Sequence, residues 1–368
     1  MALIADFFEQ TKGLQKQGLQ HGLEAYAFAR SALFRTEAMV GPAFEFLLKG
    51  KRPRLAVDDP KLFKAASASI IELLRRDIAN ITAGYYPAEV LLPENPIKHL
   101  MRLPSMVLEI ANFSSRREKK QAHKFSESAR ELLQGLPEYY QRNFHFQDDG
   151  YLSEKSAELY EHQVELLFSG SADAMRRLII PQMKAHFGKD HDGTGLTFCE
   201  LAAGTGRGTK FVRLAFPKAK IVAVDLSAPY LKRAQAELKR FARHDFVEAN
   251  ASDLPFKDGQ FDAVYSIFLF HELPMEERKA VIRESMRVLK AGGFHGVLDS
   301  LQKGDEKDFD VALEMFPKEF HEPFYKNYIE NPMEKLIEGE GMPVQNVNIG
   351  FFSKSVSSVK DAKVEAKH

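Results

Sequence analysis

A glycine-rich segment at residues 198–208 carries the strongest chemical signal in this chain, and it reads FCELAAGTGRG. Its apolar start predicts a buried strand, and its glycines predict a tight turn that opens a helix. Such a turn lets backbone N–H groups approach a ligand where a Cβ atom would block it. Because dinucleotide-binding and nucleoside-binding folds share this pattern, the segment alone predicts only a nucleotide-like ligand.

Three acidic residues stand at or just past the ends of predicted strands, namely Glu200, Asp225 and Asp253. Ligands of open parallel sheets bind outside the carboxyl ends of the strands, so we expect these carboxylates to share one crevice. Asp225 can accept hydrogen bonds from both ribose hydroxyls, and Asp253 can accept from the exocyclic amine of adenine. Glu200 can face a ligand ammonium. The chain has no G-x-x-x-x-G-K-[ST] loop, which argues against a nucleoside triphosphate.

The elements that position these residues alternate between short strands and helices. Predicted strands cover 196–201, 220–225, 245–249, 261–267 and 293–299, and predicted helices cover 209–215, 228–241 and 275–288. This alternation predicts a parallel sheet with helices on both faces. Residues 344–349 and 351–356 are expected to add an antiparallel edge pair. The predicted fold class is therefore α/β, a Rossmann-like doubly wound and mostly parallel sheet with an antiparallel edge strand.

The chain before this region predicts helices only. Asp59 and Pro60 indicate a helix start, and apolar residues then recur at helical spacing as far as Ile81. A second helical run covers 117–133. The predicted division is an all-helical N-terminal domain at 1–152, the α/β domain at 153–356 and a disordered tail at 357–368.

Composition limits the partners and the location that we expect. The 51 basic and 51 acidic residues cancel, so no global field attracts nucleic acid or anionic lipid. No segment approaches the roughly 18 apolar residues that span a bilayer, and the N-terminus lacks the basic region of a signal peptide. One cysteine, Cys199, excludes an intramolecular disulfide, and no spacing indicates metal ligands. We expect a cytoplasmic protein without nucleic acid, integral membrane segment or metal, and a homo-oligomer stays open.

Five motifs occur in the order and at the spacing of one enzyme family. They are ELAAGTGRG at 200–208, VDLS at 224–227, DLPF at 253–256, GQFDAV at 259–264 and RVLKAGG at 287–293. With these motifs the chain resembles the class I S-adenosylmethionine-dependent methyltransferases, and it is similar to small-molecule enzymes such as the C-methyltransferases of quinone biosynthesis. The resemblance implies S-adenosylmethionine as cofactor and methyl transfer to a small, apolar or aromatic acceptor. The N-terminal domain would shape acceptor binding or mediate oligomerisation.

The resemblance also implies a set of cofactor-binding residues. The set is Tyr160, Glu200, Ala202, Gly204, Gly206, Asp225, Leu226, Asp253, Leu254, Ser266 and Phe268. Its glycines would approach the methionine portion, and its tyrosine would reach the methionine carboxylate. The two residues after the fourth strand would border the sulfonium. One departure is Ala202, which stands where the family usually has its first glycine and makes the turn less permissive.

Three residues are candidates for catalysis. His271 follows the fourth strand, near the expected place of the methyl group, and imidazole titrates near neutral pH. Its alternative is a structural hydrogen bond at a helix start. His321 and Tyr325 belong to an aromatic stretch in the segment that often covers the acceptor. The alternative for this stretch is a loop packed by aromatic side chains.

A polar and aromatic segment at 139–151 is the candidate acceptor pocket. We expect Asn143, His145 and Tyr151 to contact the acceptor, because a plain core segment does not need this combination. The alternative is an interdomain connector. Position 266–269 reads SIFL rather than Asn-Pro-Pro-Tyr, which disfavours methylation of amide or adenine nitrogens. An RNA or protein methyltransferase, a non-catalytic S-adenosylmethionine-binding module and a nicotinamide-dependent dehydrogenase stay open as alternatives.

Overall fold

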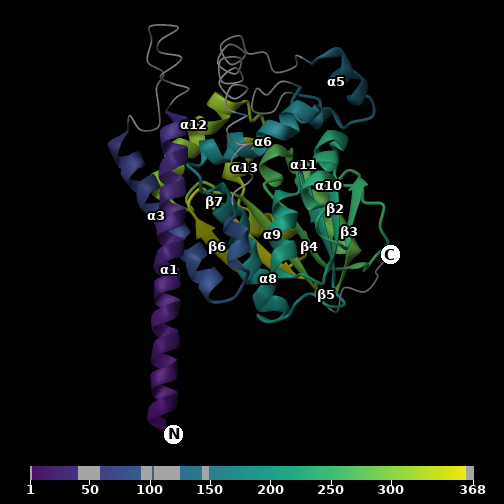
Figure 1. The fold of residues 1–368 in the computed structure, drawn as a ribbon. Coiled ribbons are helices and arrows are strands. Elements are labelled where there is room, and N and C mark those ends of the chain that lie inside the picture. Colours follow the sequence, from purple (N-terminus) through teal and green to yellow (C-terminus); the bar gives the residue numbers. More distant parts are fainter. Residues whose placement is uncertain (1, 40–58, 93–101, 103–124, 143–148, 362–368) are drawn as a thin grey trace.

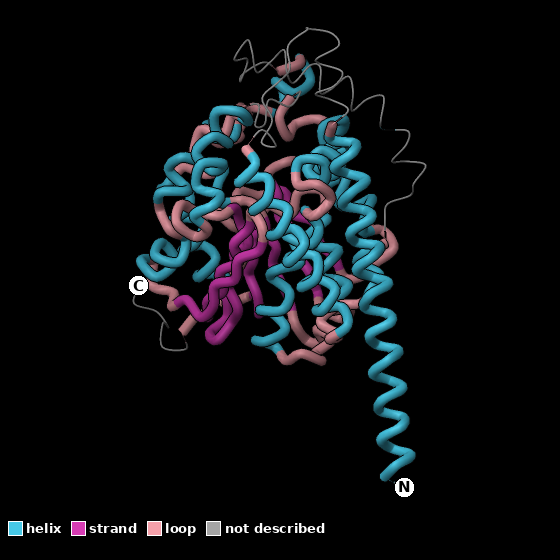
Figure 2. The backbone as a smooth tube through the Cα atoms, turned by 90° about the vertical axis from the view of Figure 1, so that its left-hand side faces the viewer, coloured by secondary structure: helices cyan, strands magenta, loops and turns pink. Residues whose placement is uncertain are grey.

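A central sheet with helices on both of its faces forms the core of the molecule (Figure 1). The computed structural model describes residues 2–39, 59–92, 102, 125–142 and 149–361. Figure 2, turned by 90°, shows the strands in the middle layer between helices. No helix within these described ranges is long and apolar enough to cross a membrane.

The sheet has seven strands in the order β3-β2-β1-β4-β5-β7-β6. The strands are β1 (Thr197–Leu201), β2 (Lys220–Asp225), β3 (His244–Glu248), β4 (Phe261–Ile267), β5 (Leu289–Ser300), β6 (Val344–Gly350) and β7 (Ser353–Val359). The first five in sequence pair in parallel, and β7 pairs antiparallel with both β5 and β6. The predicted fold class is confirmed. The chain order reverses between β1 and β4, which is where ligands bind in such sheets.

The helices of the α/β region follow the predicted alternation. They are α6 (Glu154–Leu167), α7 (Ala172–Arg176), α8 (Ile180–Phe187), α9 (Arg207–Ala215), α10 (Ala228–Leu238), α11 (Met275–Val288), α12 (Asp310–Phe320), α13 (Tyr325–Glu330) and α14 (Met333–Gly339). β2, β4 and α11 have the predicted bounds, and α10 ends three residues before the predicted end. A single-turn helix, η6 (Phe270–Glu272), follows β4.

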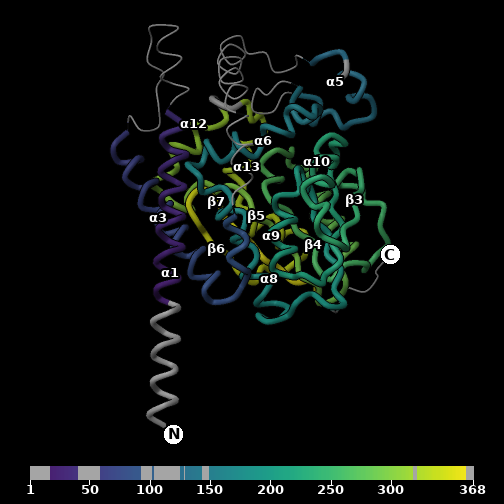
Figure 3. The backbone as a smooth tube through the Cα atoms, in the orientation of Figure 1, coloured from purple at the N-terminus to yellow at the C-terminus, as the bar shows by residue number. Residues whose placement is uncertain are grey.

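The N-terminal helices are α1 (Ala2–Ala38), α3 (Pro60–Thr82) and α5 (Glu127–Leu132). α3 packs against β6, and α1 packs against α3 and α6, whereas α5 lies away from the strands (Figure 1 and Figure 3). Asp59 caps α3 as predicted, since its carboxylate accepts the N–H groups of Lys61 and Leu62. The apolar face of α3 belongs to the same hydrophobic core as β1. The described part of the N-terminal region therefore shares its core with the α/β region, and the domain division at 152 stays a prediction.

The C-terminal strand corrects the predicted disordered tail. β7 continues to Val359, which pairs with Phe294 of β5, and the carbonyl of Lys360 accepts the N–H of Gly292 at 2.8 Å. The prediction of disorder from residue 357 is therefore wrong for 357–361, and 362–368 lie outside the described residues. The serines of this strand resemble a solvated tail in composition, yet Ser357 and Ser358 are buried because small side chains fit between neighbouring layers.

Candidate functional site

The glycine turn joins β1 to α9 and forms one wall of a pocket. Ala202 and Gly204 line this pocket with φ angles of 54° and 56°. Ala202 thus adopts a left-handed backbone that favours glycine, at a cost of roughly 1–2 kcal/mol. Gly206 is also left-handed, and a Cβ atom there would lie 3.0 Å from the Cβ of Ala234 in α10. Gly206 therefore lets α9 start close to α10, and it does not line the pocket.

The carboxylate of Asp225, at the end of β2, is fixed by two backbone donors. Its Oδ2 accepts the N–H of Gly204 at 2.7 Å, and its Oδ1 accepts the N–H of Ser227 at 2.8 Å. Asp225 is buried and lines the pocket. Burial raises its pKa to about 6, although the N–H groups of Ser227 and Gly204 favour the ionised form.

Glu200 brings a second buried carboxylate to the pocket. Only 1% of its surface is exposed, and the hydroxyl of Tyr265 donates to its Oε2 at 3.0 Å. Burial raises the pKa of Glu200 to about 7. A Cβ atom on Gly208 would lie 2.5 Å from Oε1 of Glu200, so the glycine leaves the space that this carboxylate occupies. A cationic group in the pocket would stabilise both carboxylates in their ionised forms.

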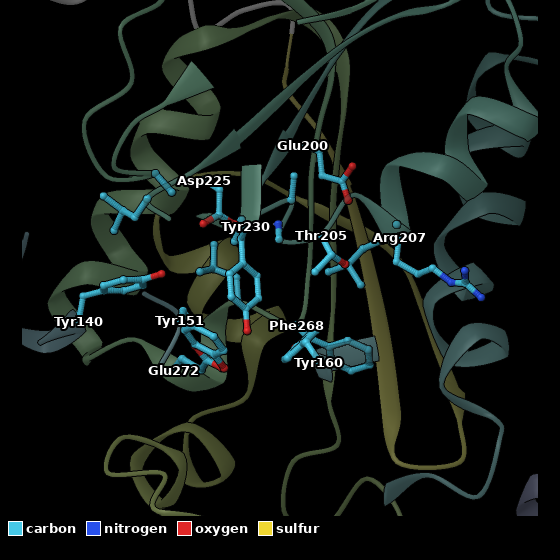
Figure 4. Close-up of a pocket in the computed structure, with 18 of the residues that line it drawn as sticks. Tyr140, Tyr151, Tyr160, Glu200, Thr205, Arg207, Asp225, Tyr230, Phe268 and Glu272 are labelled. Atoms are coloured by element: carbon cyan, nitrogen blue, oxygen red, sulfur yellow. Dashed lines mark hydrogen bonds between the residues drawn. The ribbon is translucent and has the colours of Figure 1, made fainter. Parts of the chain in front are cut away.

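Figure 4 shows how these residues surround the pocket at the carboxyl ends of the strands. Five tyrosines line it from four segments, and they are Tyr139, Tyr140, Tyr151, Tyr160 and Tyr230. Their rings contact one another edge to face: the ring centroid of Tyr230 lies 5.3 Å from that of Tyr151 and 5.6 Å from that of Tyr160. Burial raises the pKa of the Tyr151 and Tyr160 hydroxyls. These hydroxyls are therefore neutral donors at physiological pH.

Part of the pocket is lined by charged and polar side chains, which are those of Arg176, Arg207, Thr205 and Glu161. Arg207 Nε donates to Asp173 at 2.9 Å, and Arg176 Nη1 lies 3.1 Å from Glu161. The Thr205 hydroxyl donates to the same glutamate. Sequence reasoning missed this group, apart from the presence of Thr205 and Arg207 in the glycine motif. It also missed Tyr230, and it included Tyr139 and Tyr140 only as part of the segment 139–151, since spacing alone does not show that separate segments meet.

Most of the predicted cofactor residues line the pocket, and four do not. Those that line it are Tyr160, Glu200, Ala202, Gly204, Asp225, Leu226 and Phe268, whereas Gly206, Asp253, Leu254 and Ser266 are absent from its lining. Asp253 is exposed, so the structure brings together two of the three acids expected in one crevice. Leu254 is buried, and its N–H donates to Glu284 at 3.0 Å. The binding roles of all these residues stay predictions.

None of the three candidate catalytic side chains lines the pocket. His271 is buried in η6, and its Nδ1 lies 2.7 Å from Oδ1 of Asp299. Burial alone would lower the pKa of His271, but the carboxylate of Asp299 with those of Glu322 and Glu272 raises it to about 9. Tyr325 is buried with its hydroxyl 2.6 Å from Oγ of Ser300. Neither side chain lines the pocket, and neither does His321, which ends α12 with a φ of 50°.

The predicted acceptor residues are only partly described. Asn143 and His145 lie outside the described residues. Tyr151 lines the pocket, and its hydroxyl donates to Oε1 of Glu272 at 2.5 Å.

Glu272 also lines the pocket, and with His271 and Glu322 it forms a cluster of potential metal ligands within the described part of the chain. No metal spacing was apparent in the sequence, because fifty positions separate Glu322 from Glu272.

Known proteins match the part of the chain that holds the glycine turn, β2 and β4. A family model described as a methyltransferase domain matches residues 198–293. The demethylmenaquinone methyltransferase of Clavibacter sepedonicus is 42% identical over 99 residues, which are 27% of this chain and 39% of that protein. The ubiquinone/menaquinone biosynthesis C-methyltransferase UbiE of Escherichia fergusonii is 31% identical over 168 residues, which are 43% of this chain and 66% of that protein.

The chain thus spans less than half of the first relative and about two thirds of the second. A solved structure of magnesium protoporphyrin IX methyltransferase from Synechocystis PCC 6803 is 16% identical, covers 52% of this chain and 86% of that chain, and has a TM-score of 0.39. Residues 198–293, which hold the glycine turn and Asp225, are thus a methyltransferase domain of the class I S-adenosylmethionine-dependent type.

Proposed function

We propose that this chain transfers the methyl group of S-adenosylmethionine to a small acceptor with an aromatic or apolar body, and that it does so in the cytoplasm. One observation carries the proposal. The pocket joins the glycine turn and two buried carboxylates of the matched segment to four tyrosines from residues before that segment. The residues that would hold the cofactor thus share the pocket with tyrosine rings, which suit a flat and mostly apolar molecule.

The residues present fit the cofactor. Asp225 would accept from the ribose hydroxyls, and Glu200 would face the ammonium, whose charge would offset the burial of the carboxylate. Arg176 and Thr205, which line the pocket beside Glu161, would offer donors to the methionine carboxylate. When bound, S-adenosylmethionine supplies an electrophilic methyl group on a positively charged sulfur.

The chain's own contribution would be to position the acceptor and exclude water. Alignment of two reactants is worth about 7–11 kcal/mol of barrier, whereas a general base adds about 10²–10⁴-fold. Tyr151 and Glu272, which lie next to each other in Figure 4, are polar groups that an acceptor hydroxyl or enol would meet. The aromatic rings around them would hold the rest of the acceptor. A base role for His271 stays a prediction, and its side chain does not line the pocket.

The segment before α6 would determine which acceptor enters, because it supplies Tyr139, Tyr140 and Tyr151 to the pocket. We keep Asn143 and His145 of the same segment as proposed acceptor contacts. Separate changes of these two residues to alanine should lower turnover and leave cofactor affinity unchanged. Unchanged turnover in both variants would remove them from the site.

The test measures release of S-adenosylhomocysteine by the full chain with candidate acceptors. The names of the relatives suggest demethylmenaquinone as the first acceptor, followed by small hydroquinones and catechols. Acceptor-dependent product, absent in Asp225→Ala, would support the proposal. Binding of the cofactor by calorimetry without turnover on any acceptor would favour a non-catalytic binding module. Turnover only with RNA or a protein, or absence of cofactor binding, would contradict the proposal.

A further inference from the structure

We propose that His271, Glu272 and Glu322 bind a divalent transition-metal ion at the edge of the pocket. Each residue offers one ligand atom, and these atoms lie within 4.8 Å of one another. Nε2 of His271 lies 3.8 Å from Oε1 of Glu272. Metal–ligand bonds of about 2.0–2.2 Å place neighbouring ligands roughly 3–4 Å apart, so small side-chain movements would close the site.

The orientation of His271 is suited to a metal ligand. Its Nδ1 lies 2.7 Å from Oδ1 of Asp299, whose side chain is 1% exposed, so on metal binding Nδ1 would keep its proton while Nε2 releases its proton and supplies an electron pair. Oδ2 of the same aspartate accepts the N–H of Phe270 at 2.6 Å, which fixes the carboxylate. A histidine ligand whose other nitrogen donates to a carboxylate is the usual arrangement around protein-bound metals.

Arg278 of α11 holds the two segments of the cluster together. The side chain of Arg278 is fully buried. Its Nε donates to the carbonyl of Phe270 in η6 at 2.9 Å, and its Nη2 donates to the carbonyl of Phe324 at 3.0 Å. Phe324 lies two residues after Glu322, so the arginine sets the distance between the segment that carries Glu322 and η6. The hydroxyl of Tyr328 donates to the carbonyl of Ser300 at 2.7 Å and attaches the same segment to the end of β5. The cluster is therefore built on fixed backbone rather than on mobile surface side chains.

The charges and donor types favour a particular class of ion. Three carboxylates, those of Asp299, Glu272 and Glu322, surround one imidazole, and Glu322 is 1% exposed. A divalent ion among these carboxylates would offset part of the cost of burying them. One imidazole nitrogen with two carboxylate oxygens suits manganese, iron, cobalt or zinc better than magnesium or calcium, which prefer oxygen alone.

The position of the site suggests its role. Glu272 lines the pocket, whereas His271 and Glu322 are buried beside it, so three protein ligands would leave open positions towards the pocket. A ligand with an exposed oxygen, such as an enol, a catechol or an α-hydroxy acid, would occupy those positions. This acceptor role rests on the proposed methyl transfer, but metal binding itself does not.

The test is a metal titration of the full chain after treatment with a chelator. Loss of the free Mn²⁺ signal in electron paramagnetic resonance and the visible absorption of bound Co²⁺ report binding. We expect one ion per chain, and we expect Glu322→Gln and Glu272→Gln to lose it. Asp299→Asn should weaken binding by about 10–100-fold, because it removes the acceptor that orients His271. Glu314→Gln in α12 is the matched control, since that exposed glutamate pairs with Lys303 instead.

Calorimetry of S-adenosylhomocysteine binding shows whether each variant is folded. The same measurement tests the cofactor site without the metal, so failure of the metal site can be told apart from failure of the proposed function. A wild-type chain that binds S-adenosylhomocysteine but no Mn²⁺, Co²⁺ or Zn²⁺ would overturn the metal site only. Metal binding that is equal in the wild type and in both folded glutamine variants would also overturn it. If either glutamine variant fails to fold, the other variant and Asp299→Asn decide. Loss of turnover on metal removal, with cofactor affinity retained, would support the acceptor role.

Discussion

The backbone N–H of Gly204 donates to Oδ2 of Asp225 at 2.7 Å, so the turn after β1 and the end of β2 form one unit. The other oxygen of the carboxylate accepts the N–H of Ser227 at 2.8 Å. Both contacts exist within the chain itself, and they hold the carboxylate in place before a ligand arrives. Such preorganisation lowers the ordering cost of binding.

Replacement of Asp225 should therefore weaken cofactor binding strongly. Asp225→Ala removes the acceptor for two backbone donors and for the ribose hydroxyls, and hydrogen bonds to a charged group are worth about 1.5–3 kcal/mol. We expect the dissociation constant of S-adenosylhomocysteine to rise about tenfold or more, as measured by calorimetry. Asp245→Asn is the control, because this exposed aspartate of β3 pairs with Lys220 of β2 instead. Equal affinity in Asp225→Ala and wild type would contradict the role of Asp225.

The contribution of Glu200 to the stability of the ligand-free chain should fall as pH rises. Burial raises its folded-state pKa to about 7, while the unfolded chain titrates near about 4.3. The folded state thus binds more protons between these values, so the free energy of unfolding decreases from acidic to neutral pH. The share of Glu200 is roughly 3 kcal/mol. Urea unfolding of wild type and Glu200→Gln between about pH 5 and pH 8 measures it, and parallel profiles would refute the prediction.

Cofactor affinity should change in the opposite direction with pH. The ionised carboxylate of Glu200 would attract the ligand ammonium, and that of Asp225 would accept from the ribose hydroxyls, while burial raises their pKa values to about 7 and about 6. Affinity for S-adenosylhomocysteine should therefore increase as pH rises through this range. Calorimetry across the range tests this, and Glu200→Gln should flatten the upper part of the profile. An affinity that decreases with rising pH would exclude the proposed role of these carboxylates.

Gly208→Ala should damage both stability and binding. The new Cβ atom would lie 2.5 Å from Oε1 of Glu200 and 2.7 Å from Cδ1 of Ile267, so the carboxylate must leave its position. Overpacking of this kind costs about 1–3 kcal/mol. Gly339→Ala at the end of α14 is the control, because no atom lies within 4 Å of a Cβ atom there. Thermal unfolding and calorimetry measure the two effects, and equal behaviour of the two variants would refute the packing argument.

Asp77→Ala tests whether α3 is part of the methyltransferase core. Asp77 accepts from Nη2 of Arg177 at 2.6 Å and from the hydroxyl of Tyr86 at 2.7 Å, and all three side chains are buried. Loss of one partner of a buried ion pair costs about 3–5 kcal/mol. Denaturant unfolding should show one transition that shifts as a whole. Glu89→Ala breaks an exposed pair with Arg240 and should cost about 0–1 kcal/mol. A separate, early transition for the N-terminal helices would contradict a shared core.

Local patterns were sufficient to predict the elements of the α/β region. β2, β4 and α11 have their predicted bounds because runs of apolar residues and proline or glycine punctuation act within a few residues. The tail shows the limit of such patterns. Ser357 and Ser358 look solvated in sequence, yet pairing with β5 buries them. Tertiary contacts overrule local composition whenever a strand completes its backbone hydrogen bonds with a distant partner.

The sequence by itself determined the glycine turn, the acids at the strand ends and hence the family, because these depend on residue types at short spacing. Only the tertiary structure decided that Asp253 stays exposed while Glu200 and Asp225 meet in one pocket. It also decided that tyrosines from four segments close that pocket, and that Glu322 lies beside His271. Such groupings arise from the packing of elements far apart in the chain, and long-range packing leaves no periodic signal in a single sequence.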